Sequence, residues 1–411
     1  MDIKSRLDSL RQKKSAAGNG TESSGRGKDE IKSSATSGDP EHFVKRKVLD
    51  TGHQHGRYSP GEISLSFLQE AAFLLNRERG VECEEVLFLD TETTGLAGGA
   101  GTCVFLVGLG YFSGKDFVIE QHLMRDFEEE YPLLKSVADR LDERPLPVTF
   151  NGKTFDIPLL KSRFTLQRLS FPKLKGHIDL LHPCRRLWNH LPSCSLTELE
   201  KELLDFRRGD DISGGEVPRY YRAYLENKDW KLLKPILSHN FFDVISLLGL
   251  IEHLERSVRL ENGEERSAYE LFNLGKQLEK EKKLDKSIRC YEKALAGADS
   301  RRLQEKIEER LTWQYKRSED YQEAQAIWKQ MKQENRGGIF PYVELAKFYE
   351  HQKKDHSRAL KVCMQALKYL KDKRAVISDW KEKKSELQHR RERLEEKTPE
   401  GEGRLFQERI K

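Results

Sequence analysis

The sequence has few cysteines and no long apolar run. Six cysteines are spread over 411 residues and none forms a C-x-x-C pair, so a disulfide framework is not expected. No apolar stretch approaches the length that spans a membrane, and the opening residues MDIKSRLDSLRQKK have no apolar core of the signal-peptide type. We therefore expect reduced cysteines, no membrane partner and a cytoplasmic location.

A strong excess of one charge is also missing. Lys and Arg total 73 against 68 for Asp and Glu, which gives a net charge of +5. This excess is too small to indicate a nucleic-acid partner by itself, so any basic surface must be local.

The length allows two or three domains, and composition divides the chain further. The segment before residue 40 is rich in Ser, Gly, Lys and Glu and nearly free of large apolar side chains, which predicts disorder. The predicted parts are a disordered tail (1–40), an extension that packs on the next domain (41–81), a central domain (82–257), a helical repeat domain (265–370) and a charged helical cap (371–411). Within the extension, apolar residues from Ile63 to Leu75 have helical spacing.

The central domain opens with the stretch LFLDTETTGL, residues 87–96. Its apolar run predicts a buried strand that ends in Asp90 and Glu92. Alternate residues of a strand share a face, so these two carboxylates lie together and repel one another unless a cation sits between them. Hard divalent ions take carboxylate oxygens, so the pair indicates a magnesium or manganese site.

Two later sites carry the same chemistry. Asp156 follows a short strand and opens a helix, and His239 and Asp243 lie four residues apart on a late apolar helix, hence on one helix face. The hydrophobic pattern predicts strands over 86–89, 102–112, 117–123, 147–150 and 177–181, and helices over 126–140 and 157–169. Three antiparallel strands followed by alternating helices and strands describe a mixed α/β sheet with flanking helices, of the ribonuclease H-like kind.

The combination of sites resembles the DEDD exonuclease superfamily. Asp90 and Glu92 match its first motif, Asp156 its second and Asp243 its third. Within it, the chain is similar to YprB-type bacterial exonucleases, in which a ribonuclease H-like domain precedes tetratricopeptide repeats. The stretches that carry this likeness are 88–110, 150–160, 179–188 and 238–243. His239 stands at the spacing of the tyrosine subclass, not that of the histidine subclass.

The resemblance implies a 3′ to 5′ exonuclease in which the four carboxylates hold two Mg²⁺ or Mn²⁺ ions and His239 is the general base. It also implies that the terminal nucleotide is contacted by Thr93, Thr94, Leu96 and Asn151. DNA with a single-stranded 3′ end is the implied substrate, in DNA repair beside a helicase. An exoribonuclease and a non-catalytic scaffold, whose repeats recruit partners, are the alternatives.

The C-terminal region has an internal repeat of small and large apolar residues. Leu274-Gly275 with Tyr291, and Leu311 with Trp328, predict two helix pairs of the tetratricopeptide type, and a looser third copy follows from Leu345. Three pairs are about the minimum for a stable stack. By the resemblance, these repeats bind a protein partner.

Three features leave alternatives open. The cluster His177, His182, Cys184, His190 and Cys194 matches no standard zinc module and is more typical of a core helix. Basic pairs at 185–186 and 207–208 are either solvated or contact phosphate. The loop 211–221 either positions a strand by stacking or is structural.

Overall fold

The computed structural model describes residues 28–33, 42–63, 66–67, 69–75, 77, 81–95, 101–260, 266–373 and 379–398. The chain divides into two compact units. The first comprises Met1–Pro183 and Ser193–Arg259, and the second comprises Cys184–Pro192 and Leu260–Lys411.

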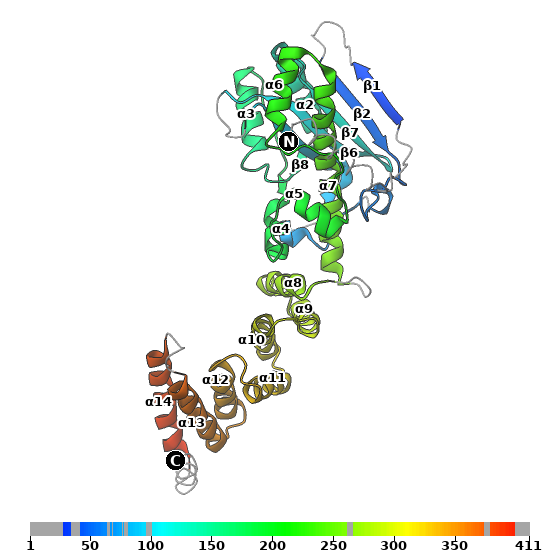
Figure 1. Cartoon of the computed structure of the whole chain (residues 1–411). Coiled ribbons are helices and arrows are strands. Elements are labelled where there is room, and N and C mark those ends of the chain that lie inside the picture. The colour runs from blue at the N-terminus through cyan, green and yellow to red at the C-terminus, as the bar shows by residue number, and fades with distance from the viewer. Residues whose placement is uncertain are drawn as a thin grey trace, which may run out of the picture. The chain divides into compact units, whose positions relative to one another are not determined.

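A mixed sheet forms the centre of the first unit (Figure 1). Its strand order is β1-β2-β7-β6-β5-β8-β9. The strands are β1 (Lys28–Ser33), β2 (Phe43–Leu49), β5 (Val86–Thr93), β6 (Val104–Ser113), β7 (Asp116–Leu123), β8 (Leu146–Thr149) and β9 (Ile178–Asp179). The pairs from β1 through β5 are antiparallel, and β5, β8 and β9 run parallel. The predicted ribonuclease H-like fold class is confirmed.

Helices flank this sheet. They are α2 (Glu130–Glu143), α3 (Asp156–Leu166), α6 (Val217–Asn227) and α7 (Leu233–Arg259). The short α5 (Leu196–Leu199) packs on α7, and α4 (Leu181–Trp188) begins in the first unit and continues into the second. The long helix α7 packs across β5, β6 and β7. It approaches β6 closely because Gly108 has no side chain: a Cβ there would lie 2.3 Å from the Asn240 side chain.

The N-terminal extension contributes to the sheet itself. β2 pairs with β7 along its whole length, and β1 pairs with β2. Residues 28–33, which composition placed in a disordered tail, are therefore a strand, and the rest of that predicted tail lies outside the described residues. The stretch Ile63–Leu75, whose spacing is helical, instead contains the short strand β3 (Ser66–Phe67), which pairs with β4 (Val81–Glu82), and a 3-10 turn at Ala72–Leu75.

Aromatic packing fixes the side of the first unit next to α6. The rings of Phe105 and Tyr221 stack with centroids 3.7 Å apart, and the Tyr221 hydroxyl donates to the Met124 carbonyl at 2.8 Å. The end of the loop 211–221 is thus part of the hydrophobic core, so this tyrosine has no free ring face for stacking on a ligand.

The second unit is helical. It contains α8 (Ala268–Lys280), α9 (Leu284–Ala296), α10 (Arg301–Arg317), α11 (Tyr321–Gln333), α12 (Phe340–Lys347), α13 (His356–Asp372) and α14 (Trp380–Lys397). Each of these helices packs on the next one in the chain (Figure 1). Where α8 meets α9, a Cβ on Gly275 would lie 2.6 Å from the Tyr291 ring, so a glycine is required there.

Residues 184–192 join this second unit, where Asn273 of α8 donates to the Leu187 carbonyl at 3.0 Å. The terminal helix α14 is only partly solvated. Its Leu387 and Leu394 are buried, and its Arg393 pairs with the buried Glu350.

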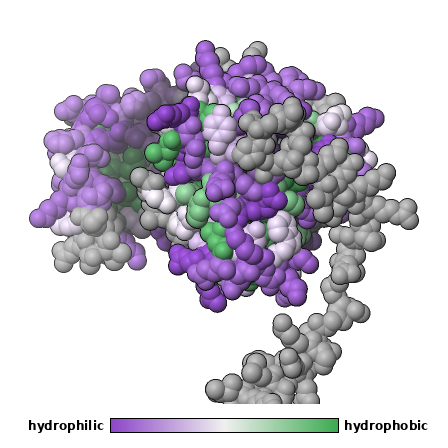
Figure 2. All heavy atoms as spheres, turned by 90° about the horizontal axis from the view of Figure 1, so that it is seen from above, coloured by the Kyte–Doolittle hydropathy of each residue, from purple (hydrophilic) through white to green (hydrophobic). Residues whose placement is uncertain are grey.

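One face of the molecule is mostly polar. Figure 2 shows a largely hydrophilic face with hydrophobic residues in small patches. Large apolar side chains that are exposed are Phe127, Tyr131, Leu166, Trp230 and Tyr269. Among the helices described, none combines the length and apolar character needed to cross a bilayer.

Candidate metal centre

The first two carboxylates stand at the end of the central strand β5. Val86 to Leu89 are fully buried between β6 and β8, which fixes the strand in the middle of the sheet. Asp90 and Glu92 then alternate onto the face that α7 covers. The pairing with β6 shifts register between Glu92 and Thr93, so the strand ends directly after the acids.

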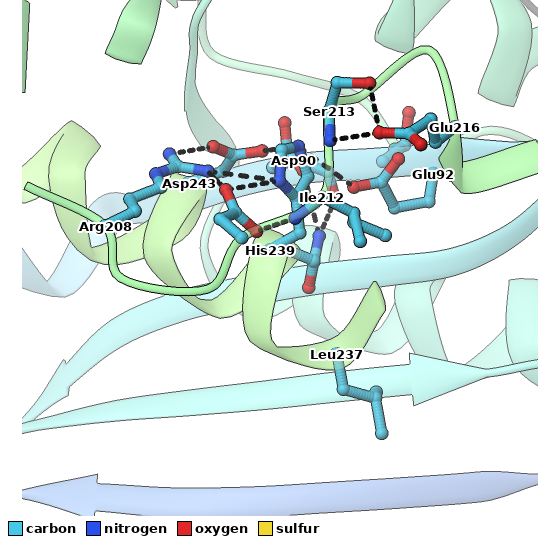
Figure 3. Close-up of polar contacts among 12 residues, drawn as sticks. Asp90, Glu92, Arg208, Ile212, Ser213, Glu216, Leu237, His239 and Asp243 are labelled. Atoms are coloured by element: carbon cyan, nitrogen blue, oxygen red, sulfur yellow. Dashed lines mark hydrogen bonds and ion pairs between the residues drawn. The ribbon is translucent and has the colours of Figure 1, made fainter. Parts of the chain in front are cut away.

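Helix α7 brings the next two side chains to this face. His239 and Asp243 lie one helical turn apart, with His239 Nε2 3.4 Å from Asp243 Oδ2 and 4.0 Å from Glu92 Oε1. The ligand atoms of Glu92, His239 and Asp243 all lie within 4.8 Å of one another. Figure 3 shows these side chains converging with Asp90 from the strand and the helix.

Asn240 ties helix and strand together. Its Nδ2 donates to Asp90 Oδ2 at 2.9 Å, and its Oδ1 accepts a hydrogen bond from Gln121 of β7 at 3.0 Å. Asn240 is fully buried, and Gly108 leaves the room that its side chain needs. This amide therefore orients one oxygen of Asp90 and leaves the other available.

Asp156 opens α3 and reaches β5 through a threonine. Thr91 Oγ1 donates to Asp156 Oδ1 at 2.5 Å. The preceding turn is held by buried Asp179, which accepts hydrogen bonds from the amides of Asn151 at 2.9 Å, Lys153 at 3.0 Å and Leu181 at 3.1 Å. The carboxylate of Asp179 therefore stabilises the turn that precedes Asp156.

The backbone conformation of Asn151 helps to form that turn. Its φ of 68° lies in the left-handed region, which asparagine tolerates better than most residues. Its Oδ1 accepts from Thr154 Oγ1 at 2.9 Å. Contact with a substrate, which the sequence also predicted, stays a prediction for this residue.

A buried arginine links the site to the loop that precedes α6. Arg208 pairs with Asp243, and its Nη1 donates to Asp211 Oδ2 at 2.9 Å. Its other partner is Glu200, which is 1% exposed and accepts from Arg208 Nε at 2.7 Å. Of the two alternatives for this basic residue, solvation is excluded, because the Arg208 side chain is only 5% exposed.

Asp211 determines how the His239 ring is protonated. His239 Nδ1 lies 2.9 Å from Asp211 Oδ2. A carboxylate accepts hydrogen bonds, so Nδ1 carries the proton and Nε2 faces Glu92 and Asp243. The loop continues over the ring, since a Cβ on Gly214 would lie 3.7 Å from Nε2. Ser213 Oγ donates to Glu216 Oε2 at 2.8 Å, which closes the turn into α6 (Figure 3).

The electrostatics of the site are those of crowded, buried acids. Burial, then repulsion from Asp243, Glu92 and Asp156, raises the pKa of Asp90 well above its ordinary range. Burial and the charge of Asp243 raise the pKa of Glu92 to about 8. Burial raises the pKa of Asp156 to about 6, against the opposing hydrogen bond from Thr91. These three carboxyl groups therefore favour their protonated form, and a bound cation could neutralise their charge in place of the proton.

The base candidate is shifted as well. Burial lowers the pKa of His239, but the hydrogen bond to Asp211 and the charges of Asp243 and Glu92 outweigh burial and raise it to about 9. Asp211 itself is stabilised as the anion: burial opposes ionisation, and the hydrogen bonds from His239 and Arg208 prevail and lower its pKa.

The other predicted contacts lie in the turn after β5. Thr93 Oγ1 donates to the Gly95 carbonyl at 2.7 Å, and Thr94 Oγ1 accepts from the Cys103 amide at 3.0 Å. Both hydroxyls therefore stabilise the turn. Leu96 lies outside the described residues.

Sequence reasoning missed the residues that orient the site. These are Thr91, Asp179, Arg208, Asp211 and Asn240. Thr91, Asp179 and Asn240 lie within the stretches 88–110, 179–188 and 238–243 that carry the family resemblance, so their position was a usable signal. Among the residues described, metal-ligating atoms gather at Glu92, His239 and Asp243, and the histidine and cysteine set around residue 184 forms no such group.

The first unit is similar to a known superfamily of proteins. Residues 87–255 match the RNase H superfamily, so the first unit carries a domain of that superfamily. The chain is 35% identical over 342 residues to the uncharacterized protein YprB of Bacillus subtilis (strain 168), covering 79% of this chain and 80% of that one. The chain therefore belongs to the YprB family.

Among solved structures, the chain is similar to the family B DNA polymerase of the archaeon Pyrobaculum calidifontis, with a TM-score of 0.34 and 16% sequence identity. The match covers 56% of this chain, and the chain spans 28% of the polymerase.

Proposed function

We propose that this protein is a metal-dependent 3′ to 5′ exonuclease that hydrolyses DNA. The observation that carries the proposal is the group of Asp90, Glu92, His239 and Asp243 between β5 and α7 of an RNase H superfamily domain. Asp156 joins the same strand through its hydrogen bond from Thr91. Crowded carboxylates in this setting favour divalent cations.

The donor set fits two Mg²⁺ or Mn²⁺ ions. Carboxylate oxygens are the ligands these ions prefer, and burial raises the pKa values of Asp90, Glu92 and Asp156, which a bound cation would lower. Asp90, Glu92, Asp156 and Asp243 are the residues that would hold these ions. Bound ions of this kind lower the pKa of a water ligand and neutralise charge on a phosphate.

His239 is the proposed general base. Because Nδ1 donates to Asp211, Nε2 is the nitrogen that accepts a proton from the attacking water. The charges of Glu92 and Asp243 that raise the pKa of His239 are the charges that bound cations offset, which favours the neutral, accepting form. Asp211 and Arg208 act through other groups, as positioning residues.

Substrate and setting complete the proposal. Thr93, Thr94, Leu96 and Asn151 are the proposed contacts of the terminal nucleotide, and a single-stranded 3′ end is the proposed substrate. By the family resemblance, the protein acts in DNA repair beside a helicase, and the C-terminal helices, as tetratricopeptide repeats, bind the protein partner.

The test is digestion of end-labelled single-stranded DNA, duplex DNA and matched RNA with Mg²⁺, Mn²⁺ or EDTA. We expect stepwise shortening of DNA from the 3′ end that is lost with EDTA and with Asp156→Asn. Asp142→Asn, an exposed acid on α2, is the matched control and should behave as wild type. Preferential shortening of RNA would make the protein an exoribonuclease, and no shortening of any substrate would leave it a scaffold.

A further inference from the structure

A second feature of the first unit has the chemistry of a ligand site. A groove of about 790 Å³ lies between β2 and the first half of α7. Lysines and aromatic rings line it, and β2 is the strand between β1 and β7 (Figure 1). We call it the β2–α7 groove.

The lysines come from both sides of the groove. Alternation along β2 places Lys45 and Lys47 on one face of the strand, and α7 contributes the exposed Lys234. No aspartate or glutamate is among the described residues that line the groove. The groove is therefore positively charged, in contrast to the acidic site nearby.

The aromatic residues that line the groove are partly exposed. Phe43 and Trp230 meet edge to face with centroids 4.8 Å apart, and Trp230 is 37% exposed. Lys47 Nζ lies 4.8 Å from the centroid of the half-buried Phe241 ring. Phe206 and Phe242 form a second pair at the other end, with centroids 5.2 Å apart.

The groove is separate from the metal centre. His239 and Asp243 project toward β5, whereas Leu237 and Phe241 project toward β2. Residues two apart on a helix point to different sides, so α7 itself divides the two sites. None of the four carboxylates lines the groove, so we expect binding there without a divalent cation.

We propose that the β2–α7 groove binds single-stranded nucleic acid. Lysines neutralise the phosphates, and partly exposed rings stack with bases, which are free to stack on protein only when they are unpaired. Such a site holds a strand at a place distinct from the site of cleavage. This inference rests on the proposed function only for the class of ligand, which is nucleic acid.

The experiment measures binding without hydrolysis. Fluorescence anisotropy of a labelled thymidine oligonucleotide of about 20 nucleotides, a length that spans one or more stacking sites, is followed with full-length protein in EDTA. Lys45→Gln/Lys47→Gln and, separately, Trp230→Ala should weaken binding at least tenfold. The double lysine variant should also show a shallower dependence of affinity on salt.

Lys115→Gln/Lys173→Gln is the matched control, because both lysines are exposed and lie outside the groove. It should bind as wild type. Each variant is compared by circular dichroism, and Trp230→Ala, at an exposed ring, keeps the test valid if the β2 variant unfolds.

Two results would overturn the proposal. One is wild-type affinity in both folded groove variants. The other is binding of a polyglutamate peptide, but not the oligonucleotide, with the same dependence on the lysines, which would make the groove a site for an acidic protein. Loss of hydrolysis by Asp156→Asn leaves the binding assay unchanged, so failure of the catalytic proposal is distinguishable from failure of this one.

Discussion

At the scale of single residues, the candidate site is defined by charge that the fold leaves uncompensated. Glu92 and Asp156 are buried and Asp90 is half-buried. Two basic side chains lie at the site: Arg208 pairs with Asp243, Asp211 and Glu200, and His239 pairs with Asp211. A metal-free domain therefore carries an electrostatic cost that a bound divalent ion removes.

This cost should appear as a pH dependence of stability. Asp90 and Glu92 have pKa values that are raised in the folded state, so the folded state binds more protons than the unfolded state between about pH 6.5 and 8. Its free energy of unfolding then falls as pH rises through that window. Thermal denaturation in EDTA should show the midpoint falling by at least a few degrees. Below about pH 6.5, buried histidines such as His42 and His55, whose pKa values are lowered, act in the opposite direction.

Mg²⁺ should reverse this fall at pH 8, and Glu92→Gln should flatten the pH profile in EDTA. Asp142→Asn, on the surface of α2, serves as the control for a lost carboxylate. A wild-type midpoint that rises between about pH 6.5 and 8 in EDTA would contradict this account of the site.

A second prediction concerns access to His239. A Cβ on Gly214 lies in ordinary contact with Nε2 at 3.7 Å, so Gly214→Leu fills the space where a water would approach. We expect kcat/KM to fall about 10- to 100-fold, the scale on which small misplacements act. Gly215→Leu is the control, since a Cβ there has only Ser213 Oγ near it, at 4.0 Å. Equal activity of the two variants would show that the attacking water does not approach His239 at Nε2.

At the scale of elements, Arg208 joins three pieces of backbone. It connects the helical segment at Glu200–Leu204, the loop with Asp211 and helix α7. Ser246 of α7 also donates to Glu200 Oε1 at 2.5 Å, and His55 lies 2.7 Å from the Ser246 hydroxyl. The site is thereby anchored to a buried polar network.

Removing the arginine should destabilise the domain. Arg208→Gln leaves Glu200 and Asp243 buried without their cation, and breaking a buried pair in this way costs about 3–5 kcal/mol. Urea denaturation followed by tryptophan fluorescence measures the change. Glu200→Gln combined with Arg208→Gln should recover part of the loss. A single variant as stable as wild type would mean that the network is not a structural support.

The elements also show what sequence alone can predict. The strands β5, β6 and β7 follow from apolar runs, because these strands are buried on both faces. The helices α2 and α3 follow from helical spacing of apolar residues, because each buries one face. β2 was missed because its pairing with β7 is a long-range contact that leaves no local pattern. Arg208 and Asp211 were missed as site residues because a buried charge in a loop has the same sequence appearance as a solvated one.

At the scale of the whole molecule, two compact units share one chain. The first contains the RNase H superfamily domain, and the second contains the helical array. Since each has its own buried core, we expect calorimetry to resolve two transitions, with Mg²⁺ raising the one that belongs to the first unit.

The substitution Gly275→Ala tests which unfolding transition belongs to the second unit. A Cβ there overlaps the Tyr291 ring, so α8 and α9 must move apart, at about 1–3 kcal/mol for overpacking. We expect the second unit to melt earlier and hydrolysis to stay at the wild-type level. In Gly297→Ala, the added Cβ has 3.8 Å to its nearest neighbour, so this variant should melt as wild type. A shift of both transitions would show that the units unfold as one.

The join between Asn240 and Asp90 has a consequence for synthesis. These residues are separated by 150 positions in the chain, yet the amide orients the carboxylate directly. The ribosome makes the acids of β5 long before α7, and a nascent domain without α7 has neither Asn240 nor His239 nor Asp243. Hydrolytic activity toward nucleic acid should therefore first appear only after α7 has left the exit tunnel, when the domain can close.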